Sequence, residues 1–329
     1  MDASTWCWLA GVLLLQAAQS IEGAGGAGWS YSGNTGPGYW ANANNTCGGN
    51  SQSPINVQYS PAKRQTYATF NFQGYDTAPT NATMSLYNTG HAINVNLGSA
   101  SRGFSVSGGG LTGTYYAAQF HFHWGGASDL TVGSEHTLES KAYPGEVHFV
   151  HYSGTYPNIS AAVASGSPTA LAVLGFFLEL DDSDNAGLNS IVSNIGNAAY
   201  AGNTTTFTQT FPFDGFLPAD RGRFYRYSGS LTTPGCNEIV VWTVFEDTIK
   251  ISRSQLTTLL GATYYVAETG QQPEAMANNF RPVQNLNSRE VTRSFERSGG
   301  SGTWRISPAW QVIGLGVLIA ASFCPQCVP

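Results

Sequence analysis

Three histidines in two short segments have the residue type and spacing of a metal site. His121 and His123 are separated by one residue, and His148 follows in a second segment, residues 146–151. A neutral imidazole nitrogen is the commonest protein ligand for transition metals. Three such ligands can hold one zinc ion and leave its fourth position open for water, which is the arrangement of a catalytic rather than a structural zinc site.

Both segments alternate like β-strands, and this alternation decides where the histidines point. Residues i and i+2 of a strand face the same side, so His121 and His123 share one face, and Glu146 and His148 share a face of a second strand. Metal-bound histidines usually donate their other ring N–H to an acceptor, and Glu146 and Gln119 are placed to accept. Spacing alone leaves an alternative open, because a His-X-His pair is often only the polar side of an alternating strand.

The elements around these segments predict a mainly β (α+β) fold. We expect a single domain with a large, mostly antiparallel, twisted central sheet and short peripheral helices. Alternating or β-branched runs predict strands at residues 92–97, 119–124, 146–151, 170–180 and 239–245. Helical patterns are few, at residues 186–199 and 252–260, where Ser252 or Ser254 is a candidate N-cap. Gly, Asn, Ser and Pro clusters separate the runs.

The composition excludes one class of partner. Charged residues make up only 10% of the chain, and the formal net charge is −6. The sequence contains no cluster of basic residues, so nucleic acid is not an expected partner.

The two ends of the chain read as processing signals. Residues 1–20 join an apolar run to small residues, which is typical of a secretory signal peptide, and residues 21–28 form a flexible Gly- and Ala-rich segment. Residues 290–308 read as a linker with a region for GPI attachment, and residues 309–329 as a hydrophobic tail. Small residues, a spacer and an apolar tail are typical of a GPI-anchor signal. A single membrane span and a plain secreted tail remain alternatives.

The cysteines and sequons also fit a secreted chain. Three cysteines lie in the segments predicted to be removed, so Cys47 and Cys236 remain as a pair. In an oxidising compartment such a pair is expected to form a disulfide, with metal ligation as the alternative. We expect the protein outside the cell, attached to the outer face of the plasma membrane or else secreted. Candidate glycosylation sites are Asn44, Asn81, Asn158 and Asn203.

Several segments, in order, resemble the α-class carbonic anhydrases of the secreted or membrane-anchored type. The resemblance covers residues 29–289, which we take as the domain. The matching segments are residues 52–56, 119–125, 133–137, 146–148, 228–234 and 279–284. Several motifs in the family's order are far more specific than the histidine spacing alone.

The resemblance implies an extracellular zinc hydro-lyase that interconverts carbon dioxide and bicarbonate through a zinc-bound hydroxide. Zn²⁺ would be bound by His121, His123 and His148, whose rings would be oriented by Gln119, Glu146 and Asn279. Thr232 would accept a hydrogen bond from the hydroxide and donate one to Glu135, which orients the nucleophile. Non-catalytic relatives have typically lost a zinc histidine, whereas this chain keeps all three. A binding module of that kind is therefore the weaker alternative.

The same resemblance assigns the substrate pocket and the path for the proton. Carbon dioxide is uncharged, and its apolar wall would come from Val150, Val173, Leu231 and Trp242. His91 matches the proton-shuttle histidine, and imidazole titrates near neutral pH. Tyr31, Asn88 and Asn94 match positions that hold the chain of waters, and Cys47 and Cys236 match the paired cysteines of the secreted and membrane-bound members.

Overall fold

The computed structural model describes residues 28–80, 82–265 and 273–297. The predicted signal peptide, nearly all of the segment 21–28, Asn81 and the predicted C-terminal tail lie outside these ranges. Within the described ranges, no helix combines the length and the apolar character that crossing a membrane requires.

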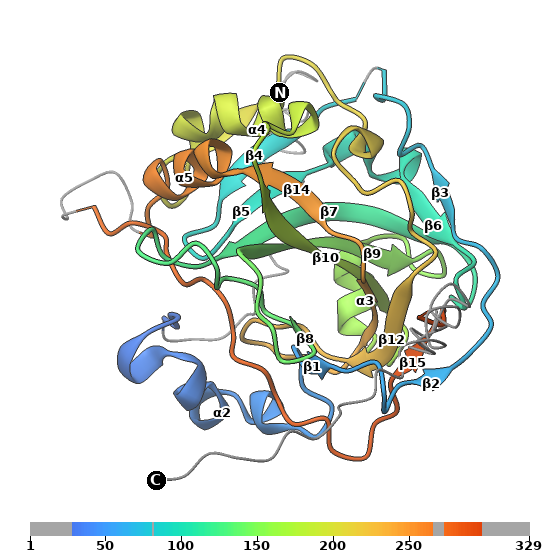
Figure 1. Ribbon diagram of the computed structural model, residues 1–329. Helices are drawn as coiled ribbons and strands as arrows, with labels where there is room; N and C mark the ends of the chain where they lie inside the picture. The colour runs from blue at the N-terminus through green and yellow to red at the C-terminus, as the bar shows by residue number, and fades with distance from the viewer. Residues whose placement is uncertain (1–27, 81, 266–272, 298–329) are drawn as a thin grey trace, which may run out of the picture. The chain divides into compact units, whose positions relative to one another are not determined.

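A sheet of 13 strands forms the centre of the fold (Figure 1). Its main path runs in the order β11-β4-β5-β7-β9-β10-β13-β12-β15-β2, with β14 beside β10 and the pair β3 and β6 beside β7. The strands are β2 (Lys63–Arg64), β3 (Asn71–Gln73), β4 (Ser85–Asn88), β5 (Ile93–Asn96), β6 (Ser105–Ser107), β7 (Tyr115–Trp124), β9 (Gly145–Ser153), β10 (Leu171–Asp181), β11 (Thr204–Thr206), β12 (Phe224–Gly229), β13 (Val240–Phe245), β14 (Ile249–Ser252) and β15 (Thr292–Arg293). A separate parallel pair joins β1 (Asn56–Val57) to β8 (Thr137–Leu138).

The predicted fold class is confirmed, with one correction to the sheet. The five predicted strand segments correspond to β5, β7, β9, β10 and β13. The sheet is mixed rather than mostly antiparallel, because β10 pairs in parallel with both β13 and β14, and β15 pairs in parallel with β2. Parallel neighbours need long crossover connections, and these join strands far apart in the chain, which local sequence patterns do not reveal.

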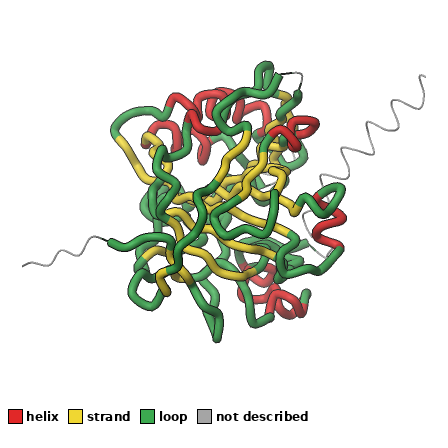
Figure 2. Tube along the Cα trace, turned by 90° about the vertical axis from the view of Figure 1, so that its right-hand side faces the viewer, coloured by secondary structure: helices red, strands yellow, loops and turns green. Residues whose placement is uncertain are grey.

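Short helices surround the sheet (Figure 2). The α-helices are α2 (Trp40–Ala43), α3 (Ile159–Ala164), α4 (Asn189–Asn194) and α5 (Arg253–Gly261), and the 3₁₀ turns are η1 (Gly33–Thr35), η2 (Pro37–Tyr39), η3 (Asn45–Gly48), η4 (Gly98–Gly103), η5 (Ala186–Leu188), η6 (Ile195–Ala198) and η7 (Phe213–Gly215). The helical segment predicted at 186–199 is therefore three short pieces. Ser252 is the N-cap of α5, where its hydroxyl accepts from the Gln255 N–H at 3.0 Å and the Gln255 side chain accepts from the Ser252 N–H at 3.3 Å. This reciprocal capping satisfies two donors that the helix itself leaves unpaired.

The two sides of the central strands pack into different cores. Phe120, Phe122 and Phe149 belong to the larger core, whereas Val150 and Trp242 belong to the second. Because successive strand residues alternate sides, neighbouring residues of β7 and β9 enter different surroundings. The polar residues on the second side are therefore held by strands that the larger core keeps fixed.

A disulfide ties the N-terminal part of the described chain to the loop after β12. Cys47 and Cys236 are bonded, with their Cα atoms 4.9 Å apart. The half-cystines pack with Trp40 in a small aromatic cluster. Covalent closure of so long a loop restricts the unfolded chain more than the folded one, so the bond is expected to stabilise the fold.

Candidate metal centre and active site

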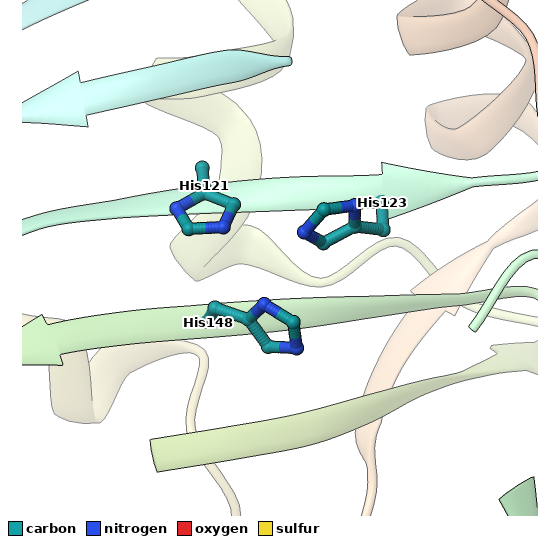
Figure 3. A group of neighbouring side chains, drawn as sticks. All are labelled: His121, His123 and His148. Atoms are coloured by element: carbon teal, nitrogen blue, oxygen red, sulfur yellow. The ribbon is translucent and has the colours of Figure 1, made fainter. Parts of the chain in front are cut away.

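The register of β7 and β9 brings the three predicted histidines together. His121 stands opposite His148, and His123 stands opposite Glu146. Figure 3 shows His121 and His123 on one strand and His148 on its neighbour. The ring centroids lie 5.0 Å apart for His121 and His123, 5.2 Å for His121 and His148, and 4.7 Å for His123 and His148. One ligand atom from each ring lies within 4.8 Å of the other two, which is close enough to share one metal ion.

Hydrogen bonds to the protein use one nitrogen of each histidine ring and so determine which nitrogen remains available to bind a metal. The Nδ1–H of His121 donates to Gln119 Oε1 at 2.9 Å, and the Nδ1–H of His123 donates to the main-chain oxygen of Asn279 at 2.7 Å. His148 uses its other nitrogen, because its Nε2–H donates to Glu146 Oε1 at 2.8 Å. The lone pairs therefore remain on Nε2 of His121, Nε2 of His123 and Nδ1 of His148. Such outer partners hold ligand rings in one tautomer and orientation.

Two buried polar atoms beside these rings have no partner in the described part of the chain. They are His123 Nε2 and Glu135 Oε2, which lie 3.5 Å apart. An unpaired buried polar atom costs free energy, so an unused imidazole nitrogen in this place fits a metal ligand. Burial lowers the pKa of His121 and of His123, and their neighbouring histidines lower it further. Neutral rings offer the lone pairs that zinc requires, so the residues present fit Zn²⁺.

A second group of three potential metal ligands overlaps the first, but its ligand atoms are already used in hydrogen bonds within the protein. His136, Glu146 and His148 also have ligand atoms within 4.8 Å of one another. However, His136 Nδ1–H donates to Glu146 Oε1 at 2.7 Å, and its Nε2 pairs with the Tyr227 hydroxyl at 2.6 Å. Burial raises the pKa of Glu146, but His136 and His148 more than offset this and hold it well below its usual range. The second group is therefore a hydrogen-bonded support for His148 rather than a metal site.

A glycine in the next strand leaves room for this support. Gly175 of β10 stands opposite His148. A Cβ at this position would lie 2.9 Å from Glu146 Oε1 and 3.6 Å from the Trp242 ring. Any larger residue would therefore push the carboxylate away from His148.

The three histidines line a cavity of about 160 Å³ that has one polar and one apolar side. The apolar residues predicted for the substrate pocket all line it: Val150, Val173, Leu231 and Trp242. Thr232 lines it too and is buried, as is Glu135, whose Oε1 accepts from the Arg281 N–H at 2.8 Å. The structure thus gathers the predicted ligands, the predicted pocket residues and Thr232 around one space, while the roles assigned to them stay predictions.

The residues predicted for the proton path are placed differently from one another. His91 and Asn94 line the cavity, whereas Asn88 and Tyr31 do not. The buried amide of Asn88 bonds to main-chain groups, accepting from the Gly90 N–H and donating to Ala199 and Tyr264 oxygens. Asn88 therefore holds the turn before His91, and its role in a water chain remains a prediction.

His91 lies against an aromatic ring. Its imidazole stacks on Trp29 with centroids 3.7 Å apart and planes 12° apart, and Tyr31 meets it edge-on. Burial lowers the pKa of His91 to about 4. In this position the ring carries few protons at neutral pH.

Three contributors to the site had no predicted role. His136 and Tyr227 extend the support of Glu146, and Arg281 fixes Glu135 through its main chain. His136 and Arg281 lie inside segments that carried the resemblance, so membership in those segments was the available signal. The polar wall also includes Tyr87, Asn96 and Thr204. Tyr87 and Thr204 lie on β4 and β11, which the sequence did not predict, whereas Asn96 lies on the predicted strand β5.

The predicted sequons differ in exposure. Asn158 is exposed and caps α3, where its Oδ1 accepts from the Ala161 N–H at 2.9 Å. Asn44 and Asn203 are half-buried, and each also accepts a main-chain N–H through Oδ1. Their glycosylation remains a prediction.

Comparison with known proteins agrees with the class of site that this geometry defines, a three-histidine metal centre on a mixed sheet. The profile of the eukaryotic-type carbonic anhydrase family matches residues 35–295. Carbonic anhydrase 15 of Mus musculus is 36% identical over 320 residues, covering 94% of this chain and 96% of that protein. Carbonic anhydrase 12 of Homo sapiens is 36% identical, covering 87% of this chain and 78% of that protein, and human carbonic anhydrase 6 is 35% identical, covering 81% and 83%.

The chain therefore belongs to the carbonic anhydrase family, and it is a carbonic anhydrase whose cofactor is zinc. The predicted family, enzyme class and cofactor are confirmed. The matched region extends to Phe295, past the predicted domain end at residue 289. This extension includes β15, which pairs with β12, and the buried side chain of Phe295.

Proposed function

We propose that this enzyme catalyses the reversible hydration of carbon dioxide outside the cell, with zinc held by His121, His123 and His148. The observation that carries the proposal is the group of three rings, in which one ligand nitrogen from each lies within 4.8 Å of the other two and one nitrogen of each is not used in a hydrogen bond to the protein. When bound, zinc lowers the pKa of a coordinated water toward neutrality, an effect best known from carbonic anhydrases themselves. The chain's own residues then bind the substrate and orient the attack.

Glu135 and Thr232 supply the orientation in this proposal. Arg281 already donates to Glu135 Oε1, while Oε2 faces the histidine rings at 3.5 Å from His123 and 3.8 Å from His148. In the proposed arrangement the Thr232 hydroxyl would donate a hydrogen bond to this carboxylate, whose Oε2 has no partner in the described residues. The hydroxyl oxygen could then only accept from the attacking group. A nucleophile held in this way presents its lone pair to the substrate, and correct orientation lowers the barrier.

The apolar side of the cavity receives carbon dioxide. Val150, Val173 and Trp242 are each at most 3% exposed, and they lie beside His148. An uncharged, linear substrate gains from such a surface, whereas bicarbonate is charged and is better solvated in water. This difference favours release of the product.

His91 carries the proton from the cavity to solvent in this proposal. Because its pKa is about 4 while it stacks on Trp29, transfer near neutral pH requires the ring to turn away from Trp29. Asn94, which lines the cavity, can hold water on the way. His91→Ala is expected to slow turnover in weak buffer and to recover with added imidazole, whereas an unchanged rate in weak buffer would remove this role.

The extracellular location is supported by the disulfide. Cys47–Cys236 belongs to the class of bonds that persist in oxidising compartments and are rare in the cytosol. The predicted signal peptide and the predicted GPI-type tail also support an extracellular location. Release from cells by a phosphatidylinositol-specific phospholipase C tests the anchor, and protein that stays on the membrane favours a spanning tail.

Stopped-flow measurement of carbon dioxide hydration tests the proposed activity. The purified protein is assayed zinc-loaded, chelator-treated and re-loaded. We expect a rate far above buffer that disappears with the metal and returns with it. A zinc-loaded, folded protein that hydrates carbon dioxide no faster than buffer would overturn the proposal.

A further inference from the structure

A second cavity, which shares no lining residue with the cavity around the histidines, is lined by an arginine that has no acidic partner in the described part of the chain. The cavity has a volume of about 310 Å³, and Arg226 and Gly110 are among its lining residues. Arg226 is only 8% exposed. Burying a guanidinium is costly unless its charge is paired, yet no carboxylate of the described residues lies within 4.0 Å of it.

The hydrogen bonds of Arg226 use one side of the guanidinium. Its Nη2 donates to the Gly109 oxygen and to Thr243 Oγ1, each at 2.9 Å, and its Nε donates to Thr243 Oγ1 at 3.2 Å. Nη1 makes no hydrogen bond with any residue that the structure describes. Two N–H donors of a buried cation are therefore left over beside the cavity.

Aromatic rings compensate part of the charge. The Arg226 guanidinium lies 5.6 Å from the ring centres of Tyr67 and Phe224 and 6.0 Å from that of Phe70. Such contacts attract a cation without accepting its N–H groups. Burial lowers the pKa of Arg226 to about 10, which still leaves it charged at neutral pH.

The backbone next to Nη1 is kept open by a glycine. Gly110 has a φ of +81°, and a Cβ there would lie 3.5 Å from Nη1 and 2.4 Å from the Tyr67 ring. Its main-chain N–H has no acceptor within the described ranges. The absence of a side chain at Gly110 therefore keeps the space beside Nη1 open for a ligand.

We infer that this cavity binds a small monovalent oxyanion of the carboxylate or bicarbonate type. Guanidinium N–H groups form strong, short bonds to such oxygens. The only carboxylate among the lining residues is that of Glu290, which is half-exposed and paired with Lys63. One buried positive charge facing one partly neutralised carboxylate favours an anion of charge −1 over a phosphate dianion. The inference does not depend on the proposed function.

Nitrogen-15 NMR of the arginine side chains of the zinc-loaded protein tests this inference. Sodium acetate is added to millimolar concentrations, with acetamide as the uncharged molecule of the same shape and sodium bicarbonate as the second anion. We expect the Arg226 signal to shift in a saturable way with at least one of the two anions and not with acetamide. The anion that shifts the Arg226 signal shows whether the cavity prefers a carboxylate or bicarbonate. Because the reporter is Arg226 itself, anions bound at zinc do not contribute to it.

Arg281 is the matched internal control. Its guanidinium is also buried and has no carboxylate within 4.0 Å among the described residues, but its Nη1 already donates to Gln52 Oε1 and to the Ser53 oxygen, each at 2.8 Å. Its signal should not respond. A shift of Arg226 no larger than that of Arg281, or one that acetamide reproduces, would overturn the inference.

Two variants complete the test. Arg226→Met, which also assigns the signal, should remove the response while keeping the packing against the rings. Glu290→Gln should tighten acetate binding roughly threefold, because it removes a negative charge from the cavity wall. If Arg226→Met fails to fold, the inference is still tested by the comparison of the Arg226 and Arg281 signals and by the acetate titration of Glu290→Gln. An acetate affinity that is unchanged in Glu290→Gln counts against the inference.

Discussion

On β7 and β9, one face carries His121, His123 and His148, and the other carries Phe122 and Phe149. The two faces share the same backbone and are nearly equally buried. On the histidine face, each ring is held by one hydrogen bond and keeps one nitrogen uncommitted. On the phenylalanine face, rings fill space and have nothing left to bind. The difference indicates that function resides in unsatisfied atoms on one side and stability in complete packing on the other.

The largest expected effect comes from removing a ligand. His123→Ala should abolish zinc-dependent activity and weaken zinc binding by more than about 100-fold, since even loss of an outer partner costs 10–100-fold. Metal content after dialysis and stopped-flow hydration measure both quantities. Phe122→Ala, one residue away on the opposite face, is the control and should retain one zinc per molecule below its melting temperature. Full zinc retention in His123→Ala would contradict the ligand assignment.

The opposite face should respond in stability instead. Phe149 is fully buried and stacks on Phe120 with centroids 4.7 Å apart. Phe149→Ala should lower the free energy of unfolding by about 3–5 kcal/mol, while kcat/KM per zinc-loaded molecule stays within about threefold. Urea unfolding and active-site titration separate the two. A large loss of activity in molecules that remain folded would show that the faces are coupled.

The sequence revealed the two faces but not the network behind one of them. Alternation in β7 and β9 was sufficient to place His121 and His123 together, and Ser252 was a readable N-cap. The tautomer of His123 depends on the Asn279 oxygen, which lies 156 residues away along the chain. Parallel pairing of β10 with β13 likewise depends on contacts between distant segments. Local patterns specify which side a residue faces, whereas long-range contacts decide which atom it meets.

A small change behind the histidine face should have an intermediate effect. In Gly175→Ala the new methyl group would press on Glu146 Oε1 at 2.9 Å, so the support of His148 must shift. We expect zinc affinity to fall about tenfold, measured by competition with a chelator. Gly196→Ala is the matched control, because a Cβ there meets nothing within 4 Å. Equal zinc affinities in the two variants would show that Glu146 does not need this space.

The smallest effect concerns a histidine on the phenylalanine side. His151 is fully buried, and its Nε2 pairs with the Tyr75 hydroxyl at 2.6 Å. Burial lowers its pKa to about 4, whereas in the unfolded chain it is about 6.5. Between these values the unfolded state binds more protons, so this contribution to stability is complete above about pH 6.5 and is lost as the pH falls toward 4.

His151→Gln should remove that contribution, because glutamine does not titrate. The stability of the variant should decline less steeply with acid, by at most about 1.4 kcal/mol per pH unit. Urea unfolding of both proteins across this pH window measures the difference, and the metal-face histidines cancel because both proteins contain them. Tyr75→Phe keeps the titrating ring and should keep the steep slope. If His151→Gln and the parent protein decline in parallel, His151 does not account for the acid sensitivity, and groups other than those on the phenylalanine side of β9 carry it.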